Sequence, residues 1–379
     1  MTGPRITHVI AEFSHREAMG RTVWETTRRL PGEHSIIAAH VHDHADDFVE
    51  VAELGGQMET FPAGRGEAFA AALAGQRPDL VHVHGGALVP LLVAGTPLRW
   101  YRSVATIYAW PKLPNVRRLQ QAGWRAAVDS NVLRPRVLAT TALPARVAAR
   151  ALRKAGVSAV LSPDPRVLSK LSGRLDVPLL RLGSGAPSSS LRAHWAADAP
   201  VVLFVGRAET VRGVDTLIEA FPEVRRAVPG ARLRLLLLPR PELDSIVAAA
   251  SALGDAVEIS TEAIPDVPAA MAAAQVGVWP FKFDYTTSPP AMAVAEAMSV
   301  GLPVVSTDVA CVNAVLGDGA PAIVVAPQQP ADLAAAIIRL LTDRAEWERC
   351  ADASPGFVTD RLGWDQLARV TAEAYAAAM

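Results

Sequence analysis

The sequence predicts an α/β protein made of two doubly wound parallel-sheet domains. Its 379 residues are too many for one ordinary hydrophobic core, since single cores stop growing at about 250–300 residues. Short, nearly continuous apolar runs alternate with longer amphipathic stretches, which is typical of buried parallel strands joined by helices. The stretch "APSSSLRAHWAADAP" at 186–200 interrupts this alternation, and we predict the domain boundary there.

Composition and charge narrow the classes of function. Apolar residues make up 50 % of the chain and charged residues 20 %, as expected for a globular protein with a large core. The formal net charge of −1 gives no overall field that would attract nucleic acid, so no nucleic-acid partner is expected. Cys311 and Cys350 lie in no metal-binding or redox spacing. Without a signal-peptide pattern or a bilayer-length apolar run, we expect a cytoplasmic protein.

The first domain is predicted over 1–185. A helix is expected over 20–30, after the first strand. The predicted strands are the apolar runs at 7–13, 34–42, 79–85, 103–109 and 157–163. In paired domains of this kind, ligands bind beyond the carboxyl ends of the strands, in the crevice between the sheets. Functional residues are therefore expected in the loops that follow strands.

The second domain is predicted over 186–360, where the alternation starts again. Its strands are expected at 201–207, 232–239, 257–260, 276–281, 303–308 and 322–327. Its helices are expected at 213–228, 241–253, 266–275 and 330–343, with a further helix inside "DYTTSPPAMAVAEAMSVGLPVVSTD" at 284–308.

That further helix has recognisable start and stop signals. Ser288 is suited to cap its N-terminus, and Pro289 or Pro290 to occupy its first position. Gly301 can adopt the left-handed conformation that ends a helix. The helix would then point its N-terminus into the interdomain crevice.

Such a helix start is suited to bind an anion such as a diphosphate, through free N–H groups around Ala291 and Met292. Glu296 would lie about two turns further in, roughly 12 Å from Ser288 by helical rise. Its carboxylate can accept hydrogen bonds from two vicinal hydroxyls, such as those of a ribose. Pairing with a neighbouring arginine for structure is the alternative, and the pattern does not separate the two.

A second anion signal lies in "FVGRAETVRGVDTLIEAF" at 204–221. Gly206 and Arg207 follow a predicted strand, and Arg212 precedes Gly213, where a helix begins. Two cations five residues apart on one loop can hold a diphosphate from two sides. The alternative is a pair of solvated surface arginines.

Together these stretches resemble the retaining, nucleotide-sugar-dependent glycosyltransferases of group 1, the glycogen-synthase-like class with the GT-B fold. "VGRAETVRGVDTLIEAF" and the later "EAMSVGLPVV" are most similar to that family. The stretches "DLVHVHG", "PDVPAAMAAAQVGVWPF" and "LGWDQLARVTAEAYAAA" extend the resemblance over nearly the whole chain. The resemblance implies two Rossmann-like domains facing a central cleft, with the final helix, 361–379, packed back on the first domain.

The resemblance also implies roles for single residues. Arg207 and Arg212 would hold the donor diphosphate, Arg212 standing where the family usually has Lys. Glu296 would bind the nucleotide ribose, and Gly20 would let the first loop approach the donor, although Met19 replaces one of two usual glycines. The remaining expected donor-binding residues are Gly206, Ser288, Ala291 and Met292.

Two positions depart from the family pattern. Ser288 stands where the family has the first acid of a Glu-x7-Glu pair, which contacts the transferred sugar. Tyr108 stands where the family usually has a His close to that sugar, and a tyrosine can still donate a hydrogen bond. These departures leave open a homologue that binds nucleotide sugar with weak or no transfer, as partner of an active enzyme. An isomerase of related two-domain type is a remoter alternative.

The expected function is transfer of a sugar, of hexosyl type, from a nucleoside-diphosphate sugar to an acceptor hydroxyl with retention. No metal or cofactor is expected, and UDP is slightly favoured as the donor nucleotide. The expected catalytic residues are Arg207, Arg212, Tyr108 and Ser288, and those on the acceptor side are His15, His84 and Tyr108.

Two further features admit a functional and a plainer interpretation. His40, His42 and His44 would share one face of an extended chain, either as a metal site or, as we favour, as a strand end; His82 is expected to be structural. Residues 112–154 carry ten Lys or Arg and one acid, Asp129. This region would either bind an anionic membrane surface or a phosphorylated or lipid-linked acceptor, at the inner membrane face, or form a solvated helix surface.

Overall fold

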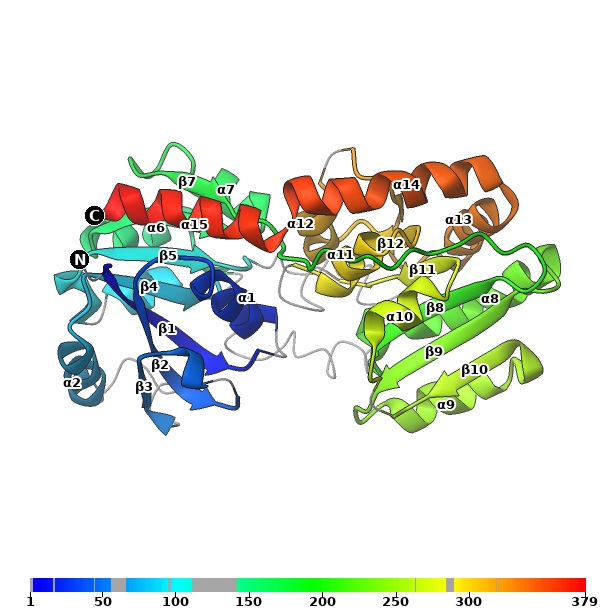
Figure 1. Cartoon of the computed structure of the whole chain (residues 1–379), viewed down its shortest axis with the longest axis horizontal. Helices are drawn as coiled ribbons and strands as arrows, with labels where there is room; N and C mark the ends of the chain where they lie inside the picture. Colours follow the sequence, from blue (N-terminus) through cyan, green and yellow to red (C-terminus); the bar gives the residue numbers. More distant parts are fainter. Residues whose placement is uncertain are drawn as a thin grey trace.

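The structure is a computed structural model that describes residues 3–15, 18–43, 45–55, 66–94, 97–110, 142–262, 264–283, 290–317 and 319–379. Within these residues, the chain forms two parallel β-sheets of seven and six strands, which lie side by side with helices packed on their faces (Figure 1). The predicted α/β class with two doubly wound sheets is confirmed. None of the described helices is long and apolar enough to cross a membrane.

The seven-stranded sheet has the order β3-β2-β1-β4-β5-β6-β7, and we call it and its helices the N-terminal unit. Its strands are β1 (Arg5–Phe13), β2 (Glu33–Val41), β3 (Glu50–Glu53), β4 (Leu80–Gly85), β5 (Ser103–Ile107), β6 (Val157–Ser162) and β7 (Leu179–Arg181). Its helices are α1 (Ala18–Thr27), α2 (Gly66–Gln76), α3 (Val89–Ala94), α6 (Ala145–Lys154), α7 (Pro165–Leu171) and α15 (Trp364–Ala378). The strand order reverses between β1 and β4, which is where a doubly wound sheet binds ligands.

The six-stranded sheet has the order β10-β9-β8-β11-β12-β13, and we call it and its helices the C-terminal unit. Its strands are β8 (Val201–Arg207), β9 (Arg232–Leu238), β10 (Val257–Ser260), β11 (Val276–Trp279), β12 (Val304–Thr307) and β13 (Ile323–Val325). Its helices are α8 (Val214–Ala227), α9 (Leu243–Ser251), α10 (Val267–Ala272), α11 (Met292–Ser299), α12 (Ala310–Leu316), α13 (Pro330–Thr342) and α14 (Arg344–Arg361). Here the order reverses between β8 and β11.

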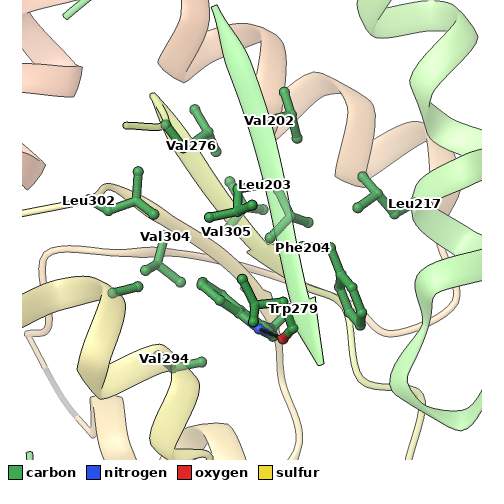
Figure 2. Packing of buried hydrophobic residues seen from close by; sticks show 14 of the residues in the cluster. Val202, Leu203, Phe204, Leu217, Val276, Trp279, Val294, Leu302, Val304 and Val305 are labelled. Atoms are coloured by element: carbon green, nitrogen blue, oxygen red, sulfur yellow. Dashed lines mark hydrogen bonds between the residues drawn. The ribbon is translucent and has the colours of Figure 1, made fainter. Parts of the chain in front are cut away.

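The core of the C-terminal unit fixes the position of that reversal. Figure 2 shows Phe204 of β8, Trp279 of β11 and Val305 of β12 among the buried apolar side chains. The Trp279 indole N–H donates a hydrogen bond of 2.9 Å to the Val205 carbonyl, so its polar atom is satisfied although the ring is buried. This contact holds the carboxyl ends of β8 and β11 together.

The chain crosses between the two units twice. It leaves the N-terminal unit after β7 and returns through α14 to α15, which lies across the first sheet (Figure 1). Trp364, Leu367 and Tyr375 of α15 are buried in one apolar cluster with Ile6 and Leu80 of the first sheet. The two crossing segments meet at the β-bridge between Ala186 and Gly363.

Candidate functional site

A basic loop follows β8 at the point where the strand order reverses. Arg207 ends the strand, and a single 3-10 turn, Thr210–Arg212, leads to Gly213 and α8. Gly213 has φ of 81°, and a Cβ there would lie 1.8 Å from the Pro280 carbonyl oxygen, so a residue with a side chain cannot adopt this geometry without movement. The glycine thus holds the loop tightly against the chain that leaves β11.

Arg212 is largely buried, so the interpretation of a solvated surface arginine is wrong for it. Its Nε lies 3.0 Å from Oε2 of Glu209, and its guanidinium lies 6.0 Å from the centre of the Phe281 ring. Burial lowers the pKa of Arg212; the Glu209 carboxylate opposes this shift, and the nearby Arg207 adds to it. The two arginines therefore lie within electrostatic reach of each other, as a two-sided diphosphate site requires.

The same strand edge carries cations that the sequence did not single out. Lys282, buried just after β11, places its Nζ 2.5 Å from Oδ2 of Asp215, and its backbone N–H donates to the Val211 carbonyl. Arg240 after β9 lies 3.8 Å from Oε1 of Glu209. The position of Lys282 directly after a predicted strand was the signal that could have identified it.

Helix α11 begins later than predicted. It runs from Met292 to Ser299 with Ala291 as its N-cap, so the predicted start at Pro289 or Pro290 is wrong. The predicted cap, Ser288, lies in 284–289, outside the described residues. Gly301 has φ of 70°, so the predicted left-handed helix end is confirmed.

The free amide predicted at Ala291 is also absent, because the Ala291 N–H donates a hydrogen bond of 3.0 Å to the Cys311 carbonyl. Cys311 in turn lies within electrostatic reach of Arg212, so it connects the basic loop to the start of α11. Met292 begins the helix and packs with its side chain against the α15 cluster. Gly206 lies inside β8, where a Cβ would meet Phe204 at an ordinary 3.4 Å, so no close approach requires a glycine there.

Glu296 is held by an arginine of the other unit. Its Oε1 lies 2.6 Å from Nη1 of Arg21 in α1, with 20 % of the Glu296 side chain and 29 % of the Arg21 side chain exposed. Arg21 also lies over the Trp364 ring, 5.6 Å from its centre. Because α11 begins at Met292, Glu296 lies about one turn into the helix rather than two. The arginine pairing left open by the sequence is thus present, and it joins the two units.

The first loop of the N-terminal unit is tied to its own backbone. A Cβ on Gly20 would lie 2.3 Å from the Ser14 carbonyl oxygen, so this glycine lets α1 pack against the end of β1. The His15 backbone N–H donates to Oδ1 of Asp43 at 2.7 Å, and its Nδ1 lies 3.0 Å from Oδ2. Both residues border the edge where ligands are expected, and their predicted roles towards donor and acceptor stay predictions.

Four buried histidines form what we call the histidine cluster: His8, His34, His82 and His84. They lie on β1, β2 and β4, under α1 and α15. His8 links His34 through one ring nitrogen, at 3.1 Å, and His84 through the other, at 3.0 Å. His84 continues to the Tyr108 hydroxyl at 3.4 Å.

Burial lowers the pKa of every member of the histidine cluster, so the imidazoles are neutral near pH 7. Burial likewise raises the pKa of Tyr108, which is 2 % exposed. Tyr108 and His84 are therefore enclosed in the N-terminal unit here, and their predicted sugar and acceptor contacts stay predictions. The burial of His82 agrees with its expected structural role.

The remaining predicted features fall partly outside the described residues. His44 is one of these, while His40 pairs with Glu53 at 3.6 Å and lies beside His42. Of the basic region 112–154, residues 112–141 are outside the described part, and the four cations on α6 face solvent.

Residues 199–343 match the family model described as "Glycosyl transferases group 1". A D-inositol 3-phosphate glycosyltransferase of Streptomyces bingchenggensis is 27 % identical over 227 residues, which cover 57 % of this chain and 49 % of that protein. The chain thus spans about half the length of the curated relatives it matches first.

Solved structures match over the whole length. A sucrose-phosphate synthase from Thermosynechococcus elongatus superposes with a TM-score of 0.70 at 18 % identity, covering 99 % of this chain and 98 % of its own. HepE of Anabaena, solved in complex with UDP-glucose, has a TM-score of 0.69 at 14 % identity, covering 99 % and 100 %. The family-model match thus spans residues 199–343, which include the basic loop after β8 and the α11 carboxylate, and the chain as a whole has the GT-B fold of these solved structures.

Proposed function

We propose that the chain transfers a sugar from a nucleoside-diphosphate sugar to an acceptor hydroxyl, with retention at the anomeric carbon. The observation that carries this proposal is the meeting, at the β8–β11 reversal, of Arg207, Arg212 and the start of α11, with Glu296 one turn further in. The basic loop is suited to a diphosphate and the carboxylate to a ribose. HepE, a structure of the same fold, is solved with UDP-glucose, which favours UDP as the nucleotide.

We propose that the C-terminal unit, 186–360, binds the donor, and that the N-terminal unit, 1–185 with the final helix 361–379, binds the acceptor. In the reaction the bond between the anomeric carbon and the diphosphate oxygen breaks, a bond to the acceptor oxygen forms, and the proton of the acceptor hydroxyl passes to the departing diphosphate. Negative charge develops on the departing diphosphate. Arg207 and Arg212 would stabilise that charge electrostatically, as a metal ion does in other enzymes. We also propose that the transferred sugar is a hexose and that the transfer uses no metal ion.

Thermal unfolding with UDP, GDP, ADP and dTDP in turn tests the donor site. A ligand at about 100 times its dissociation constant stabilises the folded state by roughly 2.7 kcal/mol, which shifts the midpoint visibly. We expect a shift with one nucleotide that is lost in the double variant Arg207→Ala, Arg212→Ala. No shift with any nucleotide, or an equal shift in the double variant, would refute the assignment of the basic loop.

A second candidate function is suggested by Tyr108 and Ser288. Tyr108 is buried and bonded within the N-terminal unit, and Ser288 supplies no negative charge where the family has an acid. A homologue that binds nucleotide sugar and assists an active enzyme would show the nucleotide shift without turnover. Turnover by the purified chain alone, compared with the chain co-expressed with neighbouring gene products, distinguishes the two functions.

A further inference from the structure

The histidine cluster brings together imidazole side chains, which are common metal ligands in proteins, and the proposed function gives these side chains no role. His8 comes from β1 and lies in register with His82 on the adjacent β4. One ligand atom from each of His8, His82 and His84 lies within 4.8 Å of the other two. The three side chains line a cavity of about 10 Å³ between the sheet and helices α1 and α15. That volume is close to the minimum that holds one water molecule.

The spacing of the ring nitrogens is close to that of a tetrahedral metal site. Zinc binds imidazole nitrogen at about 2.0–2.1 Å, so two nitrogens of a tetrahedral site lie about 3.3 Å apart. Nδ1 of His8 and Nε2 of His84 are 3.0 Å apart. The widest of the three separations, at most 4.8 Å, must shrink by up to about 1.5 Å, which rotation of an imidazole ring about its side-chain bonds can supply.

Each imidazole also has an outer partner for the nitrogen that faces away from the metal. The far nitrogen of His8 lies 3.1 Å from Nδ1 of His34. The far nitrogen of His84 faces the Tyr108 hydroxyl at 3.4 Å. Metal-binding histidines nearly always donate their second N–H to such a partner, which fixes the tautomer and the ring orientation.

The same holds for His82, whichever of its nitrogens binds the ion. Its Nδ1 lies 2.8 Å from the Tyr375 hydroxyl and its Nε2 lies 2.7 Å from Oγ1 of Thr106. One of these hydroxyls stays bonded when the other nitrogen turns to the metal. The partner Tyr375 belongs to α15, so the site would couple the last helix to the sheet.

The chemistry of the site selects the class of ion. The residues that line the cavity offer imidazoles and hydroxyls and include no carboxylate. Neutral imidazoles suit zinc-type transition metals, whereas magnesium and calcium prefer carboxylate and carbonyl oxygens. Because the ion itself would fill a cavity of this size, the fourth ligand would be one of the hydroxyls that line it, such as that of Thr22.

We propose that His8, His82 and His84 bind one zinc-type divalent ion in tetrahedral geometry, as a structural site that joins β1 and β4 beneath α1 and α15. The site includes none of Arg207, Arg212 and Glu296, the residues on which the proposed donor binding rests. A ligand that binds the folded chain but not the unfolded chain stabilises the folded state. The ion would therefore raise the free energy of unfolding of the N-terminal unit.

Metal content and cobalt spectroscopy test this proposal. The purified full chain is assayed for metal by mass spectrometry, then unfolded in chelator, freed of it, and refolded with one equivalent of Co²⁺. We expect one metal ion per chain, the intense visible absorption of tetrahedral cobalt, and a higher unfolding midpoint with metal than without. His84→Ala should lose all three, whereas the exposed His42→Ala, our matched control, should keep them.

The outer partner provides a variant that does not depend on the folding of His84→Ala. His34→Phe leaves the three ligands in place but removes the acceptor for the far N–H of His8, and loss of an outer partner lowers metal affinity about 10–100-fold. If the refolded chain takes up no Co²⁺, shows an octahedral spectrum, or binds equally well after His34→Phe, the proposal is wrong. The histidine cluster would then be a purely hydrogen-bonded part of the core.

Discussion

Arg21 forms an ion pair with the Glu296 carboxylate, to which the donor ribose is proposed to bind. Removing the Arg21 side chain should therefore tighten nucleotide binding. The Arg21–Glu296 pair is 2.6 Å long, but 29 % and 20 % of its side chains are exposed. Solvent screening therefore limits its strength to about 1 kcal/mol, the upper end for exposed pairs. A donor that must replace this contact binds about fivefold more weakly than it would without it, since 1.4 kcal/mol corresponds to a factor of ten. We expect Arg21→Ala to bind UDP about fivefold more tightly at low salt.

The companion variant should have the opposite effect. Glu296→Gln retains hydrogen-bonding capacity but loses the charge that strengthens bonds to the ribose hydroxyls, each worth about 1.5–3 kcal/mol. We expect UDP affinity to fall about tenfold or more in Glu296→Gln. In that background Arg21→Ala should have no further effect, because the carboxylate it held is gone.

Isothermal titration calorimetry with UDP on the four proteins of this cycle, at low and at high salt, measures these effects. Arg29→Ala is the matched control, since Arg29 follows the same helix and pairs with Glu25 and Asp365 instead. The gain in Arg21→Ala should shrink at high salt. Weaker or unchanged binding by Arg21→Ala, or the same gain in the Glu296→Gln background, would show that the pair does not compete with the donor.

Three further predictions concern turnover, the basic loop and the histidine cluster. Arg207→Ala should lower kcat by about 10²–10³-fold, and near-normal turnover in a steady-state assay would contradict its role on the diphosphate. Gly213→Ala should lower the free energy of unfolding in urea by more than about 2 kcal/mol, since it adds a clash with Pro280 to the strain of φ at 81°. Gly254→Ala, with φ of 65° and nothing within 4 Å of its Cβ, should lose only about 1 kcal/mol, and equal losses would rule out the clash. In chelator, the free energy of unfolding should fall as the pH drops below 6.5, the ordinary histidine pKa. The reason is that the histidines take up protons in the unfolded chain, whereas burial keeps them neutral in the folded chain. A thermal midpoint that is flat from about pH 7.5 to 5.5 would contradict this expectation.

Most strands could be predicted because a strand that is buried on both faces has a nearly continuous run of apolar residues. β8 and β10 lie where the apolar runs placed them, and Arg207 ends its strand as expected. The short edge strands β3 and β7 were missed, since "EVAE" and "LLR" are too polar or too short to stand out. Helix α14 was missed because Pro355 and Gly356 interrupt it, although it runs for 18 residues.

The contacts of the site were harder to predict than its residues. Arg21 and Glu296 are 275 positions apart in the sequence. Their contact depends on how the two units pack together, which no local sequence pattern predicts. The bond from Ala291 to Cys311 likewise comes from packing between α11 and α12. The alternating "HVH" of β4 predicts two histidines on one face of the sheet. His8 and His34 come close to them only because β1 pairs with β2 and β4, which the local pattern does not predict.

The return of α15 to the first sheet has a consequence for the order in which the protein folds during synthesis. The ribosome releases β7, ending at Arg181, long before it makes Trp364, so the apolar face over Ile6 and Leu80 waits uncovered while the whole C-terminal unit is translated. At about 5–20 residues per second this interval is on the order of 10–40 s. A nascent chain with an exposed face of this kind is a natural client for a chaperone, and premature termination anywhere after the first sheet would leave a product that aggregates rather than a stable half.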